Sequence, residues 1–228
     1  MPPSWHERWA WTVGSGPCLD TDIVLKCSAW SMADVLPRVV GHLGPPAVLG
    51  LVHLIAPRQL GRMGLAEPEA ARGELDRILG SLGRMEPSDE EIGLAAELAA
   101  LAQEADLPLD TGEAQLTAIT ILRDLPLLVT GDKRAIRALA QMRPAAERLG
   151  RRLACLEQVI EAVVAMLGPD EARDRICREP AADSTMRLVF SCHGDARSAG
   201  HAQEALASYI GDIRRGADGL LIDGSLLA

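Results

Sequence analysis

Aromatic residues are scarce in this chain of 228 residues. Phe, Trp and Tyr together make up 3% of the sequence, whereas apolar residues as a whole reach 48%. The high apolar share excludes an intrinsically disordered chain, and the low aromatic share means that Leu, Ala, Val and Ile must form most of the core. The length suits one extended domain, or a domain with an appendage.

Long apolar runs are also missing. The longest apolar stretch, PPAVLGLVHLIAP, is too short and too interrupted by His53 and the prolines to cross a bilayer. The N-terminus lacks the basic-then-apolar order of a signal peptide. We therefore expect a cytoplasmic protein without a membrane segment.

Cysteine pairs of the CxxC type are absent. The five cysteines are an odd number without this spacing, which predicts neither a disulfide framework nor a zinc module, so we expect reduced thiols. Cys27 and Cys192 are weak candidates for a nucleophile because no paired His can be located from the sequence. Cys192, His193, Asp195 and His201 form a weak candidate metal cluster, because their spacing is not that of a ligand motif.

Positive charge is limited and unevenly distributed. The formal net charge of −9 argues against a general nucleic-acid coat. Residues 133–152, however, contain seven basic residues and one acid, a local charge of +6. One face of the protein could therefore attract a polyanion.

Lysine is almost absent, because 21 of the 23 basic residues are Arg. The two lysines both lie close after an acid that follows a short apolar run. Lys26 is six residues after Asp20, and Lys133 directly follows Asp132. Arginine replaces lysine elsewhere, so these two positions could require a compact ammonium group for phosphate contact or charge balance.

Short apolar runs followed by an acid and a helical pattern recur along the chain. Asp20 and Asp132 each follow such a run and are placed as helix N-caps, and Asp110 with Glu113 has the spacing of a capping box. This alternation predicts an α/β fold with a parallel sheet, in which strand ends gather along one edge. As a cap, each acid would contribute roughly 0.5 to 2 kcal/mol. Together they would concentrate negative charge that a hard cation, Mg²⁺ or Mn²⁺, could neutralise.

Three segments, CLDTDIVLK, LDTGEAQLTAI and LLVTGDKRAI, resemble in their order the landmark segments of the PIN domain, a nuclease family. The resemblance implies a three-layer α/β, PIN-like domain with a central parallel sheet at residues 16–165. A Trp-rich strap at residues 1–15 would precede it, and a mainly helical C-terminal extension at residues 166–228 would follow it.

The resemblance also implies a metal-dependent ribonuclease, in which a water activated on Mg²⁺ or Mn²⁺ hydrolyses RNA phosphodiesters. Catalytic and metal-binding roles would fall to Asp20, Glu113 and Asp132, with Asp22 as an additional metal ligand. Substrate-binding or orienting roles would fall to Lys26, Thr130, Lys133 and Arg134. RNA is the expected partner, and an antitoxin-like protein or a second copy of the chain is left open.

Two alternatives follow from departures in the sequence. Residues 35–66 contain no Asp or Glu, and basic or apolar residues follow Asp132 where many PIN nucleases have a further acid. The thin acid set therefore leaves open an inactive PIN-like module that binds RNA or protein. LDTDIVL also resembles the first motif of haloacid-dehalogenase-type phosphatases, although Ile136 stands where their late second acid would be.

Overall fold

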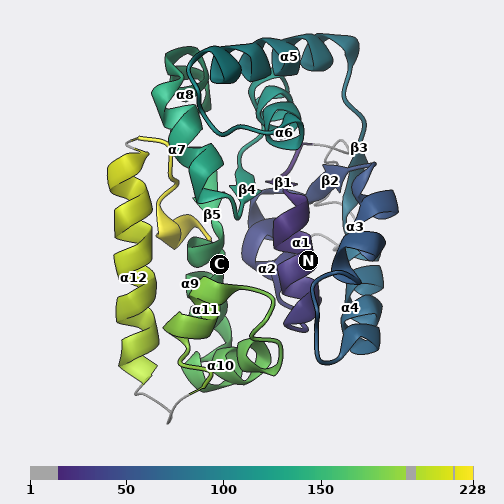
Figure 1. Ribbon diagram of the computed structural model, residues 1–228, viewed down its shortest axis with the longest axis vertical. Helices are drawn as coiled ribbons and strands as arrows, with labels where there is room; N and C mark the ends of the chain where they lie inside the picture. The colour runs from purple at the N-terminus through teal and green to yellow at the C-terminus, as the bar shows by residue number, and fades with distance from the viewer. Residues whose placement is uncertain (1–14, 194–198, 218, 228) are drawn as a thin grey trace, which may run out of the picture.

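The computed structural model describes residues 15–193, 199–217 and 219–227. Its centre is an all-parallel, five-stranded sheet with strand order β3-β2-β1-β4-β5 (Figure 1). The strands are β1 (Cys18–Leu19), β2 (Ala47–Leu49), β3 (Gly83–Met85), β4 (Leu128–Thr130) and β5 (Leu153–Cys155). The predicted α/β class with a parallel sheet is confirmed. The Trp-rich strap, apart from Ser15, lies outside the described residues.

Helices cover the sheet, an arrangement consistent with a three-layer α/β fold (Figure 1). Up to the third strand the α-helices are α1 (Thr21–Ala29), α2 (Leu36–Val40), α3 (Val52–Leu60) and α4 (Pro68–Ser81). Between the third and fifth strands they are α5 (Asp89–Glu104), α6 (Thr111–Leu122), α7 (Lys133–Gln141) and α8 (Arg143–Leu149). After the fifth strand they are α9 (Leu156–Leu167), α10 (Pro169–Arg178), α11 (Ser184–Val189) and α12 (Ala199–Gly216). Two 3₁₀ helices are η2 (Gly41–Leu43) and η3 (Gly224–Leu226). None of these helices is long and apolar enough to span a membrane.

Four of the five strands consist entirely of buried residues, and Thr130 is the one polar residue among them. They are β1, β2, β4 and β5, whereas the edge strand β3 exposes Arg84. Parallel strands covered on both faces have to be apolar almost throughout, which explains the continuous rather than alternating pattern of these segments. Cys18 pairs with Ala47 on one side and with Leu128 on the other, so β1 is central.

The sheet reverses its direction of growth between β1 and β4. From β1 the chain steps through β2 to the edge strand β3, then returns to add β4 and β5 on the other side. Ligands of open α/β sheets bind outside the carboxyl ends of the strands at such a reversal. Asp20 directly follows β1, and Asp132 lies two residues after β4, so the topology brings these two acids to the same place.

The apolar run LPL before Asp110 is not a strand. Residues 107–109 form a loop, and α6 follows and packs against α5. Pro108 has no N–H to donate to a ladder, which disfavours a central strand there. The third strand is instead the short β3, in a Gly- and Pro-punctuated region whose sequence shows no clear strand pattern.

The C-terminal helices pack directly on the sheet-bearing part of the chain. Helix α12 contacts α7 and α9, along one side of the molecule in Figure 1. Beyond it, Leu221 forms a parallel bridge with Leu153, and the Ile222 N–H donates to the Leu153 carbonyl at 2.7 Å. This segment covers the outer edge of β5, which would otherwise expose unpaired backbone groups.

A buried glutamate also ties the C-terminal segment to the core. The Glu179 carboxylate accepts hydrogen bonds from the N–H groups of Ala66, at 2.7 Å, and Glu67, at 2.5 Å. Its carbonyl accepts one at 3.3 Å from the indole of Trp30, which is 1% exposed. These bonds fix the end of α10 against the loop before α4.

The expectation that all cysteines are reduced is wrong. Cys177, in α10, and Cys192, in the turn after α11, form a disulfide. The spacing gave no sign of it, because the two cysteines lie 15 positions apart and are brought together by the fold of α10 and α11 and not by a CxxC turn. Cys18, Cys27 and Cys155 are free and buried.

Reduction of this disulfide is expected to destabilise the protein. The bond joins residues 15 positions apart, and closing a loop of that length stabilises a protein by about 3 kcal/mol on the chain-entropy account. A scan of the melting temperature with and without dithiothreitol should therefore show a fall of about 6 to 10 °C on reduction. The Cys177→Ser/Cys192→Ser variant is the control, because it should melt like the reduced protein and ignore the reductant. A variant as stable as the oxidised wild type would show that the bond contributes nothing.

Candidate active site

A cleft of about 630 Å³ opens at the carboxyl ends of β1 and β4. Six carboxylates line this cleft: Asp20, Asp22, Asp110, Glu113, Asp132 and Asp183. Three cationic side chains line it with them: Lys26, Lys133 and Arg134. The carboxylates thus outnumber the cations two to one, although the basic segment 133–152 begins at the cleft with Lys133 and Arg134.

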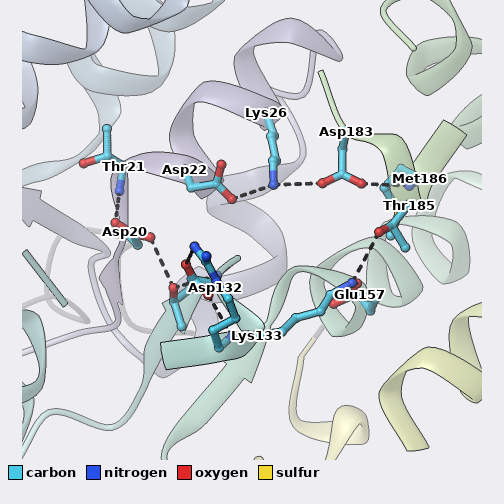
Figure 2. A network of polar contacts seen from close by, with 12 residues as sticks. Asp20, Thr21, Asp22, Lys26, Asp132, Lys133, Glu157, Asp183, Thr185 and Met186 are labelled. Carbon is cyan, nitrogen blue, oxygen red and sulfur yellow. Dashed lines mark hydrogen bonds and ion pairs between the residues drawn. The ribbon is translucent and has the colours of Figure 1, made fainter. Parts of the chain in front are cut away.

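Asp20 is the N-cap of α1 and is fixed on both carboxylate oxygens. Oδ1 accepts a hydrogen bond from the Thr21 N–H at 2.6 Å (Figure 2). Oδ2 accepts one from the Thr130 hydroxyl at 3.2 Å. The same hydroxyl accepts from the Asp132 N–H at 3.2 Å. Thr130, itself 3% exposed, therefore links the corner after β1 to the corner after β4.

Burial makes the negative charge of Asp20 costly. Burial, together with the nearby charge of Asp22, raises the pKa of the Asp20 carboxyl to about 6, although the hydrogen bonds from Thr21 and Thr130 oppose the shift. At neutral pH this carboxylate is therefore held in a place that disfavours its charge. Such a shift is common where a cation or a proton belongs in the working site.

The pKa of Glu113, which lies on α6, is raised in the same way as that of Asp20. Glu113 belongs to the capping box of α6, in which the Asp110 N–H donates to Glu113 and the Glu113 N–H donates to Asp110, both at 2.8 Å. Burial raises the pKa of Glu113 to about 7, and the charges of Asp110, Asp132 and Asp20 add to the shift. The acids of three separate segments therefore influence one another.

Asp132 is the N-cap of α7 and differs from the other two acids. Its Oδ1 accepts from the N–H groups of Arg134, at 2.7 Å, and Ala135, at 3.2 Å, and its Oδ2 pairs with the Arg134 guanidinium at 3.0 Å. Burial alone would raise the pKa of this carboxyl, but the hydrogen bonds from Arg134 and Ala135 hold it below its ordinary value. Because the Arg134 side chain is 75% exposed, it can leave Asp132 at little cost.

The ammonium group of Lys26 lies between two carboxylates from opposite ends of the chain. It is 2.7 Å from Asp22, one turn earlier in α1, and 2.8 Å from Asp183, the N-cap of α11 (Figure 2). Burial would lower the pKa of Lys26, but the two carboxylates raise it above its ordinary value, so the ammonium stays charged. Burial raises the pKa of Asp22, against the effect of Lys26.

Lys133 is held in a similar way on the other side of the cleft. Its ammonium is 2.5 Å from a carboxylate oxygen of Glu157, which is fully buried at the start of α9. It also donates to the Thr185 hydroxyl at 3.4 Å and lies 5.1 Å from the centre of the Tyr209 ring. Thr185 and Asp183 both belong to the start of α11, so this one turn contacts both lysines of the chain (Figure 2).

The carboxylate oxygens of the cleft are suitable ligands for a metal ion, but their positions in this structure do not form a coordination shell. Among the residues described, no three His, Cys, Asp or Glu side chains are positioned to hold a metal ion together. The surplus of carboxylates and the raised pKa values of Asp20 and Glu113 are nevertheless what a hard cation would relieve. Side-chain rotation, including release of Arg134 from Asp132, would be needed to close a coordination shell.

The structure brings most of the predicted site residues to one cleft. Thr130 lies just beneath the cleft and contacts Asp20 instead of lining it. The predicted residues that line the cleft are Asp20, Asp22, Lys26, Glu113, Asp132, Lys133 and Arg134.

Asp183 and Thr185, from the C-terminal part of the chain, also line the cleft and were not anticipated. Asp183 stands at the N-cap position before a helix, with its side chain accepting from the Met186 N–H at 2.8 Å. The sequence around it could have indicated this cap. Nothing local could have indicated that the cap faces Lys26, because that contact depends on how the C-terminal segment packs.

The cysteine-based candidates lose their support. Burial raises the pKa of the fully buried Cys27 thiol to about 12, so it is no thiolate nucleophile. Cys192 is in the disulfide and cannot serve as a free thiol or a metal ligand. Of its proposed companions, His193 is exposed and Asp195 lies outside the described residues. His201 belongs to no candidate metal group in the described ranges.

Comparison with known proteins gives no family for this chain. No family model, no curated protein and no solved structure matches it. The geometry and electrostatics of the cleft are therefore the basis for a functional proposal.

Proposed function

We propose that the cleft is the active site of a PIN-like, metal-dependent ribonuclease. One observation carries the proposal: Asp20, Glu113 and Asp132 come from three separate segments and line one cleft at the reversal point of the sheet. Burial and mutual repulsion raise the pKa of two of these acids. A surplus of carboxylates at this position favours Mg²⁺ or Mn²⁺ over an uncharged ligand.

The roles of the chain's own residues follow from their contacts. Asp20, Glu113 and Asp132 would hold the metal ion, which supplies a water of lowered pKa and stabilises charge on the phosphate. Thr130 would keep Asp20 and the start of α7 in register through its two hydrogen bonds. Arg134, once released from Asp132, is an exposed fork suited to phosphate oxygens.

RNA is compatible with the cations that line the cleft. The basic residues 133–152 begin at the cleft, with Lys133 and Arg134 in its lining. Part of that charge is used internally, since Arg137 pairs with Asp212 at 2.6 Å and Arg152 pairs with Asp124 at 2.6 Å. Of the cations in this segment, Lys133 and Arg134 are the two in the cleft lining, where they would contact phosphate oxygens of the substrate.

The direct test is cleavage of a fluorescently labelled single-stranded RNA by the purified protein in Mn²⁺. We expect cleavage that EDTA abolishes and that falls by about 100-fold or more in Glu113→Gln, because a metal-binding carboxylate is lost. The exposed Glu97→Gln, on α5 away from the cleft, is the matched control and should cleave like the wild type. Cleavage that survives both EDTA and Glu113→Gln would refute the assignment.

An inactive PIN-like module is the second candidate. It is favoured by the ion pair between Arg134 and Asp132 and by the open arrangement of the acids in the described ranges. The same purified proteins separate the two candidates. Equal RNA binding by wild type, Glu113→Gln and Asp132→Asn, with no cleavage by any of them, would establish the module. An antitoxin-like partner and a homodimer stay predictions, which co-expression and light scattering would test.

A phosphatase of the haloacid-dehalogenase type has less support. Its second aspartate would be Asp22, yet that carboxylate is bound to Lys26 at 2.7 Å. A phosphomonoester assay with Asp20→Asn as control would detect such an activity. A cytoplasmic location also stays a prediction, and the Cys177–Cys192 disulfide would be unusual in a reducing compartment.

A further inference from the structure

The Lys26 ammonium lies between two carboxylates, in the kind of position that a bound cation would occupy. It contacts Asp22 and Asp183 at 2.7 and 2.8 Å, and the Lys26 side chain is 14% exposed. The carboxylates come from α1 and from the start of α11, so no local sequence pattern forces them together. Both nevertheless point at one nitrogen atom, as Figure 2 shows.

The backbone around this pair is shaped to fit it. A Cβ atom at Gly131 would lie 2.0 Å from a carboxylate oxygen of Asp22 and 3.5 Å from the Lys26 ammonium. Any larger residue at the corner between β4 and α7 would therefore displace Asp22. The missing side chain at Gly131 lets the corner that carries Asp132 approach the ion pair closely.

A lysine suits this place better than an arginine. The ammonium is a compact point charge with three donors, whereas the guanidinium is a planar fork. The chain uses arginine at 21 of its 23 basic positions, so the lysine here is an exception. Nuclease sites often hold two divalent ions about 4 Å apart, with acids between them, and this chain has fewer acids than such a site requires.

We propose that the Lys26 ammonium, held between Asp22 and Asp183, is a permanent internal cation of the cleft and takes the place of a second divalent ion. The divalent ion of the proposed function then binds alone, at Asp20, Glu113 and Asp132. Asp183 is a positioning residue, because it acts through Lys26. The C-terminal segment thereby completes the cleft. This inference rests on the proposed function for the first ion only.

Removal of the ammonium tests the inference through metal stoichiometry, which isothermal titration with Mn²⁺ measures independently of catalysis. Lys26→Met leaves Asp22 and Asp183 facing each other without a cation. We expect the full-length variant to bind one more Mn²⁺ ion than the wild type. The double variant Lys26→Met/Asp183→Asn should lose that additional ion, and the exposed Arg62→Met should bind like the wild type.

The outcomes separate the two proposals. An unchanged stoichiometry in folded Lys26→Met overturns the internal-cation inference, whatever the wild type binds. A wild type that binds no Mn²⁺ and cuts no RNA overturns the proposed function, while an ion gained by Lys26→Met would still support the inference. Two ions in the wild type would also overturn the inference.

A second measurement does not depend on the folding of Lys26→Met. Because the chain has two lysines, acetylation by acetic anhydride can be followed at Lys26 by mass spectrometry, with Lys133 as an internal reference. Asp183→Asn keeps the cap of α11 but removes one of the two charges on Lys26. We expect acetylation of Lys26 to become at least about tenfold faster relative to Lys133. An unchanged ratio would show that Asp183 does not hold the ammonium.

Discussion

Replacement of Asp20 by Asn is expected to abolish RNA cleavage and to stabilise the metal-free protein at neutral pH. Cleavage should fall by about 1,000-fold, because Asp20 is one of the three carboxylates proposed to hold the metal ion. The Asn side chain keeps an oxygen that can accept from the Thr21 N–H, so the cap of α1 survives. Loss of function with a gain in stability would identify a carboxylate retained for chemistry rather than for folding.

The gain in stability follows from the raised pKa of Asp20. A folded-state pKa of about 6, against an ordinary 3.8, means that this group's contribution to stability is fully present below pH 3.8. It is lost as pH rises through about 6. The shift corresponds to at most about 3 kcal/mol, and contact with solvent in the cleft reduces the expected gain to about 1 to 2 kcal/mol. The melting temperature of Asp20→Asn should therefore exceed that of the wild type by about 4 °C at pH 7.5.

The pH dependence of this difference is the decisive measurement. Near pH 4 the wild-type carboxyl is largely protonated in the folded protein, so the two proteins should melt together. Burial lowers the pKa of His53, which raises stability with pH over an overlapping range, but His53 is common to both proteins and cancels in the difference. Addition of Mn²⁺ at pH 7.5 should stabilise the wild type and not the variant. A difference that is equal at both pH values would contradict the buried-charge explanation.

Much of the fold could be predicted because short-range signals agree with the final structure. The short apolar runs before Asp20 and Asp132 become β1 and β4, and Asp20, Asp132 and the Asp110–Glu113 box stand where caps belong. One edge of a parallel sheet then brings the corners after β1 and β4 together without further information. The hydrogen bonds that connect Asp20 to Asp132 through Thr130 are an example of this convergence.

The rest of the site depends on packing that no local pattern encodes. Glu113 reaches the cleft although its helix follows α5 and not a strand, so its arrival depends on how α5 and α6 pack together. Asp183 and Thr185 reach it because the hydrogen bonds of Glu179 with Trp30 and Ala66 hold the C-terminal segment against the core. These contacts join residues more than a hundred positions apart, beyond the reach of periodicity and capping signals.

Replacement of Lys133 by Met is expected to cause a large loss of stability. Glu157 is 0% exposed, and the Lys133 ammonium is its ion-pair partner within the described residues, at 2.5 Å. Removal of one partner leaves a buried charge without compensation, which costs about 3 to 5 kcal/mol. In a chain of this size the melting temperature should fall by about 10 °C or more. Arg137→Met is the matched control, because its ion pair with Asp212 is exposed and should contribute less than about 1 kcal/mol.

The double variant Lys133→Met/Glu157→Leu distinguishes a role of Lys133 in stability from a role in RNA binding. With both charges gone, the buried position is filled by apolar groups, and we expect most of the lost stability to return. If Lys133 contacts RNA phosphates, the restored protein should still bind RNA more weakly, and its affinity should depend less steeply on salt. Normal binding and cleavage by a stable double variant would instead mean that Lys133 neutralises Glu157 and does not touch the substrate. The phosphate contact would then fall to Arg134, whose exposed guanidinium stands next in the same helix.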